Sequence, residues 1–414
     1  MKIIKYFIWL VFAAVLIGQQ VVLRMLGVHL GPGWEVLVPG LAIFGAAFIL
    51  SWAAELAQME IPQALALAFL ALIAVVPEYA VDIYFAWTAG TKPEYIKWAA
   101  ANMTGANRLL IGLGWSVVFF CYYFSTRKKA IELEPTHRIE IFALLAATLY
   151  SFFIPIKGTI SLIDSVVLLA IFVFYIIAAA RSHHQEPELE GPVELFSKLP
   201  RLYRCLITIL LFLISGYTIY ISAQPFAEGL LESGRAWGVD EFILVQWLAP
   251  LASESPEFIV AIIFATRAMA GASIGLIVSS TVNQWTLLIA SLPIAFTLSG
   301  GTIFGMKLDS RQVEEIFLTS AQSLFAIFII SNFRFAFLEA LVLLVLFSTQ
   351  LVIPLILPAL FPGMPKESLE SLEITMRLSY AGLYIILSVL VLLLSVNRRN
   401  ALVCLIKPGS RVNS

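Results

Sequence analysis

Four acidic residues lie deep inside apolar stretches of this 414-residue chain. They form two close pairs, Glu78 with Asp82 and Glu254 with Glu257, spaced four and three residues apart. In a helix, either spacing places both members of a pair on one face. An acid at mid-membrane depth costs about 2.5–3.5 kcal/mol on insertion scales, so we expect cations or protons to neutralise these carboxylates.

A proline directly precedes Glu78 and another precedes Glu257. Pro77 and Pro256 each lack a backbone N–H and free a carbonyl one turn earlier. We therefore expect a broken helix at each position, with carbonyl oxygens beside the carboxylates. Na⁺ and Ca²⁺ prefer such oxygen ligands. The pattern predicts a metal site for Ca²⁺ or Na⁺ in which Glu78 and Glu257 are ligands.

Polar residues in the apolar helix that follows each pair add neutral oxygens. The ion-binding set that we predict is completed by Asn102, Asn107, Ser280, Thr281 and Asn283. The hydroxyl residues among them are equally well explained as hydrogen bonds that tie membrane helices together. Arg108 directly follows Asn107, and we expect it to modulate the site by pairing with an acid in place of a bound cation. The alternative is that Arg108 snorkels toward the membrane surface.

Long apolar runs must position these residues. The chain is 60% hydrophobic and 13% charged, more apolar than a soluble domain of this length can bury. Many runs are about 17–22 residues long, the length with which a helix crosses about 30 Å of hydrocarbon. We expect an all-α polytopic membrane protein with about twelve transmembrane helices. They are placed near 4–25, 33–57, 62–90, 98–124, 139–155, 160–180, 203–225, 242–268, 272–300, 314–331, 334–358 and 375–396.

The two halves of the chain are similar around their Pro–Glu pairs. The similar segments start five predicted helices apart, and an odd number of crossings gives them opposite orientations in the membrane. Inverted repeats with a midplane ion site are a recurrent plan of secondary transporters. The predicted divisions are an extra N-terminal transmembrane helix, a first five-helix repeat, a cytoplasmic linker, a second inverted repeat, and an extra C-terminal helix with a tail. Their bounds are 1–32, 33–180, 181–202, 203–358 and 359–414.

Basic residues are distributed unevenly between the two sets of predicted loops. One side, which includes both termini, holds sixteen of the 26 Lys and Arg residues, and the other side holds nine. Cytoplasmic loops carry the excess of Lys and Arg, so we expect both termini in the cytoplasm and a multi-pass protein of the cell (inner or plasma) membrane. The first helix lacks a clear cleavage site, and we expect it to be retained.

Other classes of function find little support. The chain has no H-E-x-x-H or G-x-S-x-G motif, and its four histidines fall in predicted loops, so we expect no enzyme. Cys121, Cys205 and Cys404 are scattered without C-x-x-C spacing and are expected to be inert. The few basic residues lie next to membrane spans, which indicates contact with lipid and no nucleic-acid partner. We expect no cofactor, small cations as partners, and no indication of oligomeric state.

The motifs resemble the calcium/cation antiporter superfamily, whose sodium/calcium exchangers carry two inverted repeats of the form G-T-S-x-P-E followed by G-N-x-x-G-S-N. Residues 74–78 read Ala-Val-Val-Pro-Glu, and residues 101–107 read Ala-Asn-Met-Thr-Gly-Ala-Asn. Residues 252–257 read Ala-Ser-Glu-Ser-Pro-Glu, and residues 278–283 read Val-Ser-Ser-Thr-Val-Asn. The chain resembles a divergent member, because the G-T-S turn is absent from both repeats, and its compactness favours a prokaryotic one.

The resemblance implies that Glu78 and Glu257 are the paired ion-binding glutamates, with Asn102, Asn107 and Asn283 beside them. It also implies exchange of Ca²⁺ for Na⁺ or H⁺ by alternating access at the midplane. Two alternatives remain: a monovalent Na⁺/H⁺ antiporter on the same fold, and a non-transporting ion-sensing membrane protein. Measurement of ion flux distinguishes all three.

Overall fold

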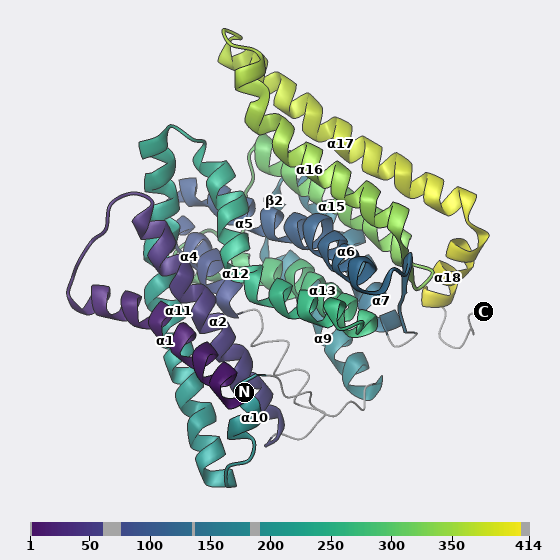
Figure 1. Cartoon of the computed structure of the whole chain (residues 1–414). Coiled ribbons are helices and arrows are strands. Elements are labelled where there is room, and N and C mark those ends of the chain that lie inside the picture. Colours follow the sequence, from purple (N-terminus) through teal and green to yellow (C-terminus); the bar gives the residue numbers. More distant parts are fainter. Residues whose placement is uncertain (1, 61–75, 135–136, 183–190, 407–414) are drawn as a thin grey trace. The chain divides into compact units, whose positions relative to one another are not determined.

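The computed structural model describes residues 2–60, 76–134, 137–182 and 191–406. Almost all of these residues are helical (Figure 1). The helices are α1 Lys2–Met25, α2 Trp34–Gln58, α4 Val76–Ala89, η1 Pro93–Tyr95, α5 Ile96–Leu109, η2 Leu110–Gly114, α6 Trp115–Thr126, α7 Arg138–Ser151, α8 Phe153–Lys157, α9 Leu162–Ser182, α10 Val193–Phe196, α11 Arg201–Trp237, α12 Glu241–Thr266, α13 Ala270–Asn283, η4 Gln284–Leu288, α14 Ile289–Leu298, α15 Ser310–Ile330, α16 Phe337–Leu360, α17 Lys366–Leu394 and α18 Val396–Ile406.

Eleven helical segments within the described residues are long and apolar enough to cross a membrane. This result confirms the prediction of an all-α polytopic membrane protein. The expected helix at 62–90 is described only from Val76, as α4, and residues 61–75 of that prediction lie outside the described residues. The remaining eleven predicted spans each correspond to one of the eleven segments.

Two short antiparallel ladders connect loops that are distant in the sequence. In the first, β1 (Ala130–Glu132) pairs with β4 (Arg334–Ala336), with Ile131 opposite Phe335. In the second, β2 (Thr159–Ile160) pairs with β3 (Met306–Lys307). The sequence analysis placed only turns or helix ends at these residues. Two- and three-residue strands have no readable alternation of apolar and polar side chains, so only the meeting of the loops creates them.

The chain forms two compact units, and each draws on both halves of the sequence. The first comprises Met1–Asn102, Ile176–Pro256 and Leu298–Gly300, and the second comprises Met103–Tyr175, Glu257–Thr297 and Gly301–Ser414. The boundaries at 102/103, 175/176 and 256/257 fall inside α5, α9 and α12, which are continuous helices.

In the first unit, α2 packs along α11, and α1 lies against α2. Close approach of α2 and α11 is possible at Gly40, because a Cβ there would lie 2.9 Å from the ring of Phe226. In the second unit, α15 packs against α7 and α17, and α16 packs against α6 (Figure 1).

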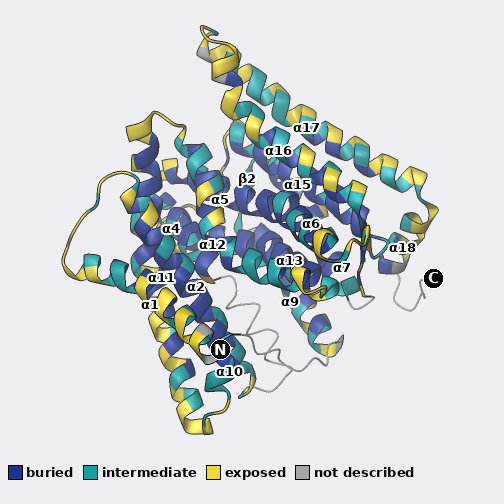
Figure 2. Ribbon diagram, in the orientation of Figure 1, coloured by how far each residue is buried: buried dark blue, intermediate teal, exposed yellow. Residues whose placement is uncertain are grey.

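Burial differs sharply between helices of the second unit (Figure 2). Helix α15 is mostly buried. In its most apolar 18-residue stretch, 72% of the residues are buried, compared with 17% in the corresponding stretch of α17. The outward face of α17 includes Leu393, and that of α1 includes Phe7, which are 64% and 65% exposed. Helices with all backbone hydrogen bonds satisfied internally can present such faces to lipid.

The end of one helix and the continuity of another differ from the expectations. Helix α11 does not end at Pro225 but continues to Trp237, so Glu228 lies inside it. Helix α12 is likewise continuous through Pro250 and Pro256, which corrects the prediction of a broken helix at Pro256. Proline removes one hydrogen bond, and membrane helices tolerate this loss when neighbouring groups satisfy the freed carbonyl.

Candidate functional site

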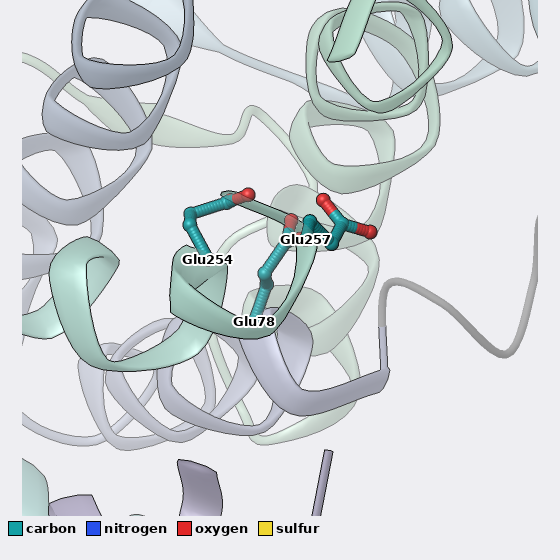
Figure 3. Close-up of side chains that lie close together, drawn as sticks. All are labelled: Glu78, Glu254 and Glu257. Atoms are coloured by element: carbon teal, nitrogen blue, oxygen red, sulfur yellow. The ribbon is translucent and has the colours of Figure 1, made fainter. Parts of the chain in front are cut away.

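Three carboxylates converge where α4 meets α12. One oxygen from each of Glu78, Glu254 and Glu257 lies within 4.8 Å of the other two (Figure 3). Glu78 is 2% exposed, Glu254 is fully buried, and Glu257 is half-buried. Within the described residues, this is the one cluster of three or more His, Cys, Asp or Glu side chains with metal-binding spacing. Carboxylates at this separation suit a hard cation with oxygen ligands.

The local sequence explains why these side chains meet. Glu254 and Glu257 are three residues apart in α12, nearly one helical turn, so both project from one face. Glu78 follows Pro77 in the first described turn of α4 and points toward the same face of α12 (Figure 3). Three of the four acids selected from the sequence are therefore brought together.

The fourth acid, Asp82, lies outside this cluster. It is one turn beyond Glu78 in α4 and is fully buried. Asn102 of α5 is close enough to interact with the Asp82 carboxylate. The prediction grouped Asp82 with the other acids because of its i,i+4 spacing, which places it on the same helix face as Glu78 but about 6 Å further along the helix axis.

Ser280 of α13 contacts the cluster directly. Its hydroxyl donates a 2.7 Å hydrogen bond to Glu257 Oε2. Thr281, the other hydroxyl residue in the predicted set, instead donates to the backbone carbonyl of Ile277 at 2.7 Å. The Ser280 hydroxyl therefore orients a carboxylate of the cluster, whereas the Thr281 hydroxyl bonds to the backbone of its own helix.

The three predicted asparagines share one feature. The amide oxygens of Asn102, Asn107 and Asn283 are buried, and no hydrogen-bond partner for them is found in the described part of the chain. Asn107 donates through Nδ2 to the Met103 carbonyl at 3.0 Å, which holds the amide in one orientation. A buried oxygen without a partner is costly, and a cation or an ordered water molecule would satisfy it.

Arg108 is paired with an acid that the sequence analysis did not select. Its guanidinium forms a buried ion pair with Glu315 of α15, and the two side chains are 3% and 6% exposed. Arg108 is buried, so the alternative considered from the sequence, snorkelling toward the membrane surface, is not observed. Glu315 belongs to the segment Ser-Arg-Gln-Val-Glu-Glu at the start of α15, where the sequence reads as an ordinary charged helix end.

Tyr79 is a further residue near the carboxylates that was not predicted from the sequence. Its buried hydroxyl lies within electrostatic range of Glu78, Asp82 and Glu254. The available signal was its position directly after the Pro77–Glu78 pair.

The chain matches a known protein family. A family model described as "Sodium/calcium exchanger protein" matches residues 33–180 and 207–356. A search of the curated proteins gave no match. A crystal structure of the H⁺/Ca²⁺ exchanger CAX matches with a TM-score of 0.87 and 42% identity, covering 97% of this chain and 96% of that one.

Two further structures are similar in fold at low identity. Native YfkE matches with a TM-score of 0.62 and 16% identity over 83% of this chain and 98% of that chain. The sodium-calcium exchanger NCX_Mj matches with a TM-score of 0.51 and 17% identity over 76% of this chain and 96% of that chain. The family model covers well over half of the residues, and this chain belongs to the sodium/calcium exchanger protein family, a family of transporters.

Proposed function

We propose that the protein is a secondary antiporter that exchanges Ca²⁺ for H⁺ at the Glu78–Glu254–Glu257 cluster. The observation that carries this proposal is the convergence of three carboxylates, within 4.8 Å of one another, from apolar helices. The function is transport, so we propose no catalytic residue and no cofactor.

The ligand chemistry favours Ca²⁺ as the transported cation. Three ionised carboxylates supply three negative charges, enough to retain a divalent ion. Ca²⁺ takes six to eight oxygen ligands. Glu78 would supply a carboxylate ligand from the first half of the chain, and Glu257 would supply one from the second half. Neutral oxygens from Ser280 and the three asparagines are the proposed supplements.

Competition for the same carboxylates would couple the two ions. Like charges this close oppose simultaneous ionisation, so the cluster is stable when it holds a cation or when protons neutralise it. Loading of Ca²⁺ then requires release of protons, and protonation releases Ca²⁺. Alternating access at a midplane site converts this exclusion into exchange.

The counter-ion is proposed to be H⁺ and not Na⁺. Support comes from the structure that is 42% identical to this chain, which is an H⁺/Ca²⁺ exchanger. The sodium-calcium exchanger structure is 17% identical, a level at which the likeness concerns the fold alone. We also propose a cell-membrane location with both termini cytoplasmic, on the basis of the Lys and Arg distribution. Lipid and small cations are the proposed partners.

The test is Ca²⁺ uptake into proteoliposomes with a Ca²⁺-sensitive dye in the lumen. An acidic lumen should drive Ca²⁺ inward, and equal pH on both sides should not. Glu78→Gln should reduce uptake by about 100-fold. Glu232→Gln, which changes an exposed acid of α11, should retain uptake.

Parallel vesicles loaded with Na⁺ at equal pH identify the counter-ion. Uptake driven only by the outward Na⁺ gradient would replace H⁺ with Na⁺ in the proposal. Proton flux linked to Na⁺ without Ca²⁺ movement would indicate a monovalent antiporter. Ca²⁺ binding without flux under any gradient would indicate an ion-sensing protein.

A further inference from the structure

A second buried polar centre surrounds Arg108, outside the carboxylate cluster. Arg108 lies in the last turn of α5, and its guanidinium pairs with Glu315 of α15. Charged side chains at membrane depth are rare because burial is costly, and they are retained where they serve a function. A salt bridge of this kind is weak support for stability alone, since well-packed apolar residues often do as well.

Helix α15 holds Arg108 at two points. Besides the ion pair from Glu315, Gln322 donates through Nε2 to the Arg108 backbone carbonyl at 3.1 Å. Glu315 and Gln322 are seven residues apart, two turns of one helix, and so share a face. Gln322 is oriented in turn by Gln350 of α16, whose Nε2 donates to Gln322 Oε1 at 2.8 Å.

The hydrogen bond from Gln322 lies next to a change in the backbone of α5. Directly after Leu109 the helix changes to a π-turn, η2, over Leu110–Gly114. A π-turn interrupts the regular i→i−4 hydrogen bonds of the helix, so the backbone geometry changes directly after Leu109. Gln322 supplies a donor to the Arg108 carbonyl at this junction.

The neighbour of Arg108 is the predicted ligand Asn107. The Asn107 side chain is anchored to Met103 of its own helix, and its buried Oδ1 has no hydrogen-bond partner within the described residues. The position of that oxygen therefore depends on the position of the helical turn, and α15 fixes that turn through Arg108. Tyr384 of α17 is fully buried and lies within electrostatic range of Arg108.

We propose that Arg108 is a positioning residue, which together with Glu315 and Gln322 sets the place of Asn107 Oδ1 as a cation ligand and so the affinity and selectivity for Ca²⁺. This inference rests on the proposed function. It assigns Arg108 a role through α15 and not as a substitute cation among the site acids.

The test compares Ca²⁺ and Sr²⁺ binding by isothermal titration of purified protein in detergent. Arg108→Gln should weaken Ca²⁺ binding about 10-fold and narrow the preference of Ca²⁺ over Sr²⁺. The charge exchange Arg108→Glu with Glu315→Arg should recover affinity to within about 3-fold of wild type, because it restores the pair.

Arg377 provides a matched control. It pairs with Glu314, the neighbour of Glu315 on α15, at 3.0 Å, and connects α15 to α17. Arg377→Gln should leave Ca²⁺ affinity and the Ca²⁺/Sr²⁺ ratio unchanged. If Arg108→Gln does not fold, Arg108→Lys can be used, because it keeps the charge but lacks the planar guanidinium group. It should show a smaller loss of Ca²⁺ affinity and of the preference for Ca²⁺ over Sr²⁺.

The outcomes separate the two proposals. Equal affinities and ratios for wild type and the Arg108 variants would overturn the positioning role, and so would an equal loss in Arg377→Gln. Wild-type protein that binds Ca²⁺ but gives no flux in vesicles contradicts the antiport proposal and leaves the positioning result intact. Wild-type protein that binds neither Ca²⁺ nor Sr²⁺ overturns both.

Discussion

A π-turn follows Asn107 and another follows Asn283, but the backbone carbonyls at the two turns accept hydrogen bonds from different sources. Each asparagine is followed by a five-residue π-turn, η2 after α5 and η4 after α13. At η4, Thr286 donates to the Val282 carbonyl at 2.6 Å, from within the same segment. At η2, the donor to the Arg108 carbonyl is Gln322 of another helix.

The difference teaches how two similar sequences can acquire unequal roles. The residue after Asn107 is a charged arginine that needs an acid from α15, whereas the residue after Asn283 is the neutral Gln284. The hydrogen bond from Thr286 at the second turn is local, whereas the hydrogen bond from Gln322 at the first comes from another helix. The first depends on tertiary structure and is the one that mutations elsewhere should disturb.

The two acid pairs also differ in how many carboxylates they contribute to the cluster. The second half of the chain contributes Glu254 and Glu257 to the cluster, but the first contributes only Glu78. A three-residue separation keeps both side chains of α12 near one point. The four-residue separation in α4 leaves Asp82 outside the cluster, beside Asn102.

The largest expected effect tests whether each half supplies one indispensable carboxylate. Glu78→Gln and Glu257→Gln should each reduce Ca²⁺ uptake in vesicles by about 100-fold, because each removes a charged ligand worth about 3 kcal/mol. Substantial uptake in either variant would show that the halves do not contribute equally.

A smaller effect is expected from the second acid of each pair, Glu254 inside the cluster and Asp82 outside it. Glu254→Gln should raise the half-saturating Ca²⁺ concentration about 10-fold, since the carboxylate belongs to the cluster. Asp82→Asn should raise it about 3-fold or less, because Asp82 lies outside the three-carboxylate cluster. Initial uptake rates over a range of Ca²⁺ concentrations measure both. The reverse order would place Asp82 in the site in place of Glu254.

The two π-turns can be compared by stability. Gln322→Ala leaves the Arg108 carbonyl and Gln350 without their partner and should lower stability by about 1–2 kcal/mol. Thr286→Val should cost about 0.5 kcal/mol, because its hydrogen bond is local. Thermal unfolding in detergent gives both values, and equal losses would contradict the distinction between local and tertiary support.

A comparably small effect is expected at the contact between α2 and α11. Glu60, just after α2, pairs with Arg201 and Arg204 at the start of α11. The hydrogen bond from Arg204 lowers the pKa of Glu60 below its usual value of 4.5. The folded state thus favours the ionised carboxyl, so this contribution is complete above about pH 4.5 and is lost as the pH falls through the folded pKa.

Glu60→Gln should therefore cost about 1 kcal/mol or less at pH 7, with the deficit shrinking only below about pH 4.5. Unfolding midpoints of variant and wild type at pH 7, 5 and 4 test this result. A deficit that already disappears by pH 5 would contradict the direction of the shift.

Much of this protein follows from its sequence by itself. Apolar runs of membrane-spanning length determine helices, because an unpaired backbone in hydrocarbon is too costly. The cost of acids inside such runs singled out Glu78, Glu254 and Glu257, which the structure brings together. The family resemblance also lay in those residues, and the match to the sodium/calcium exchanger family agrees with it.

Tertiary structure alone decided the remaining features. Helix α11 continues past Pro225, and α12 past Pro256, because the loss of one hydrogen bond does not end a packed helix. The exclusion of Asp82 and the pairing of Arg108 with Glu315, 207 residues away, depend on which helices pack together. Sequence spacing determines which face of a helix a side chain occupies, but the partner on that face is set by long-range packing, for which no local signal exists.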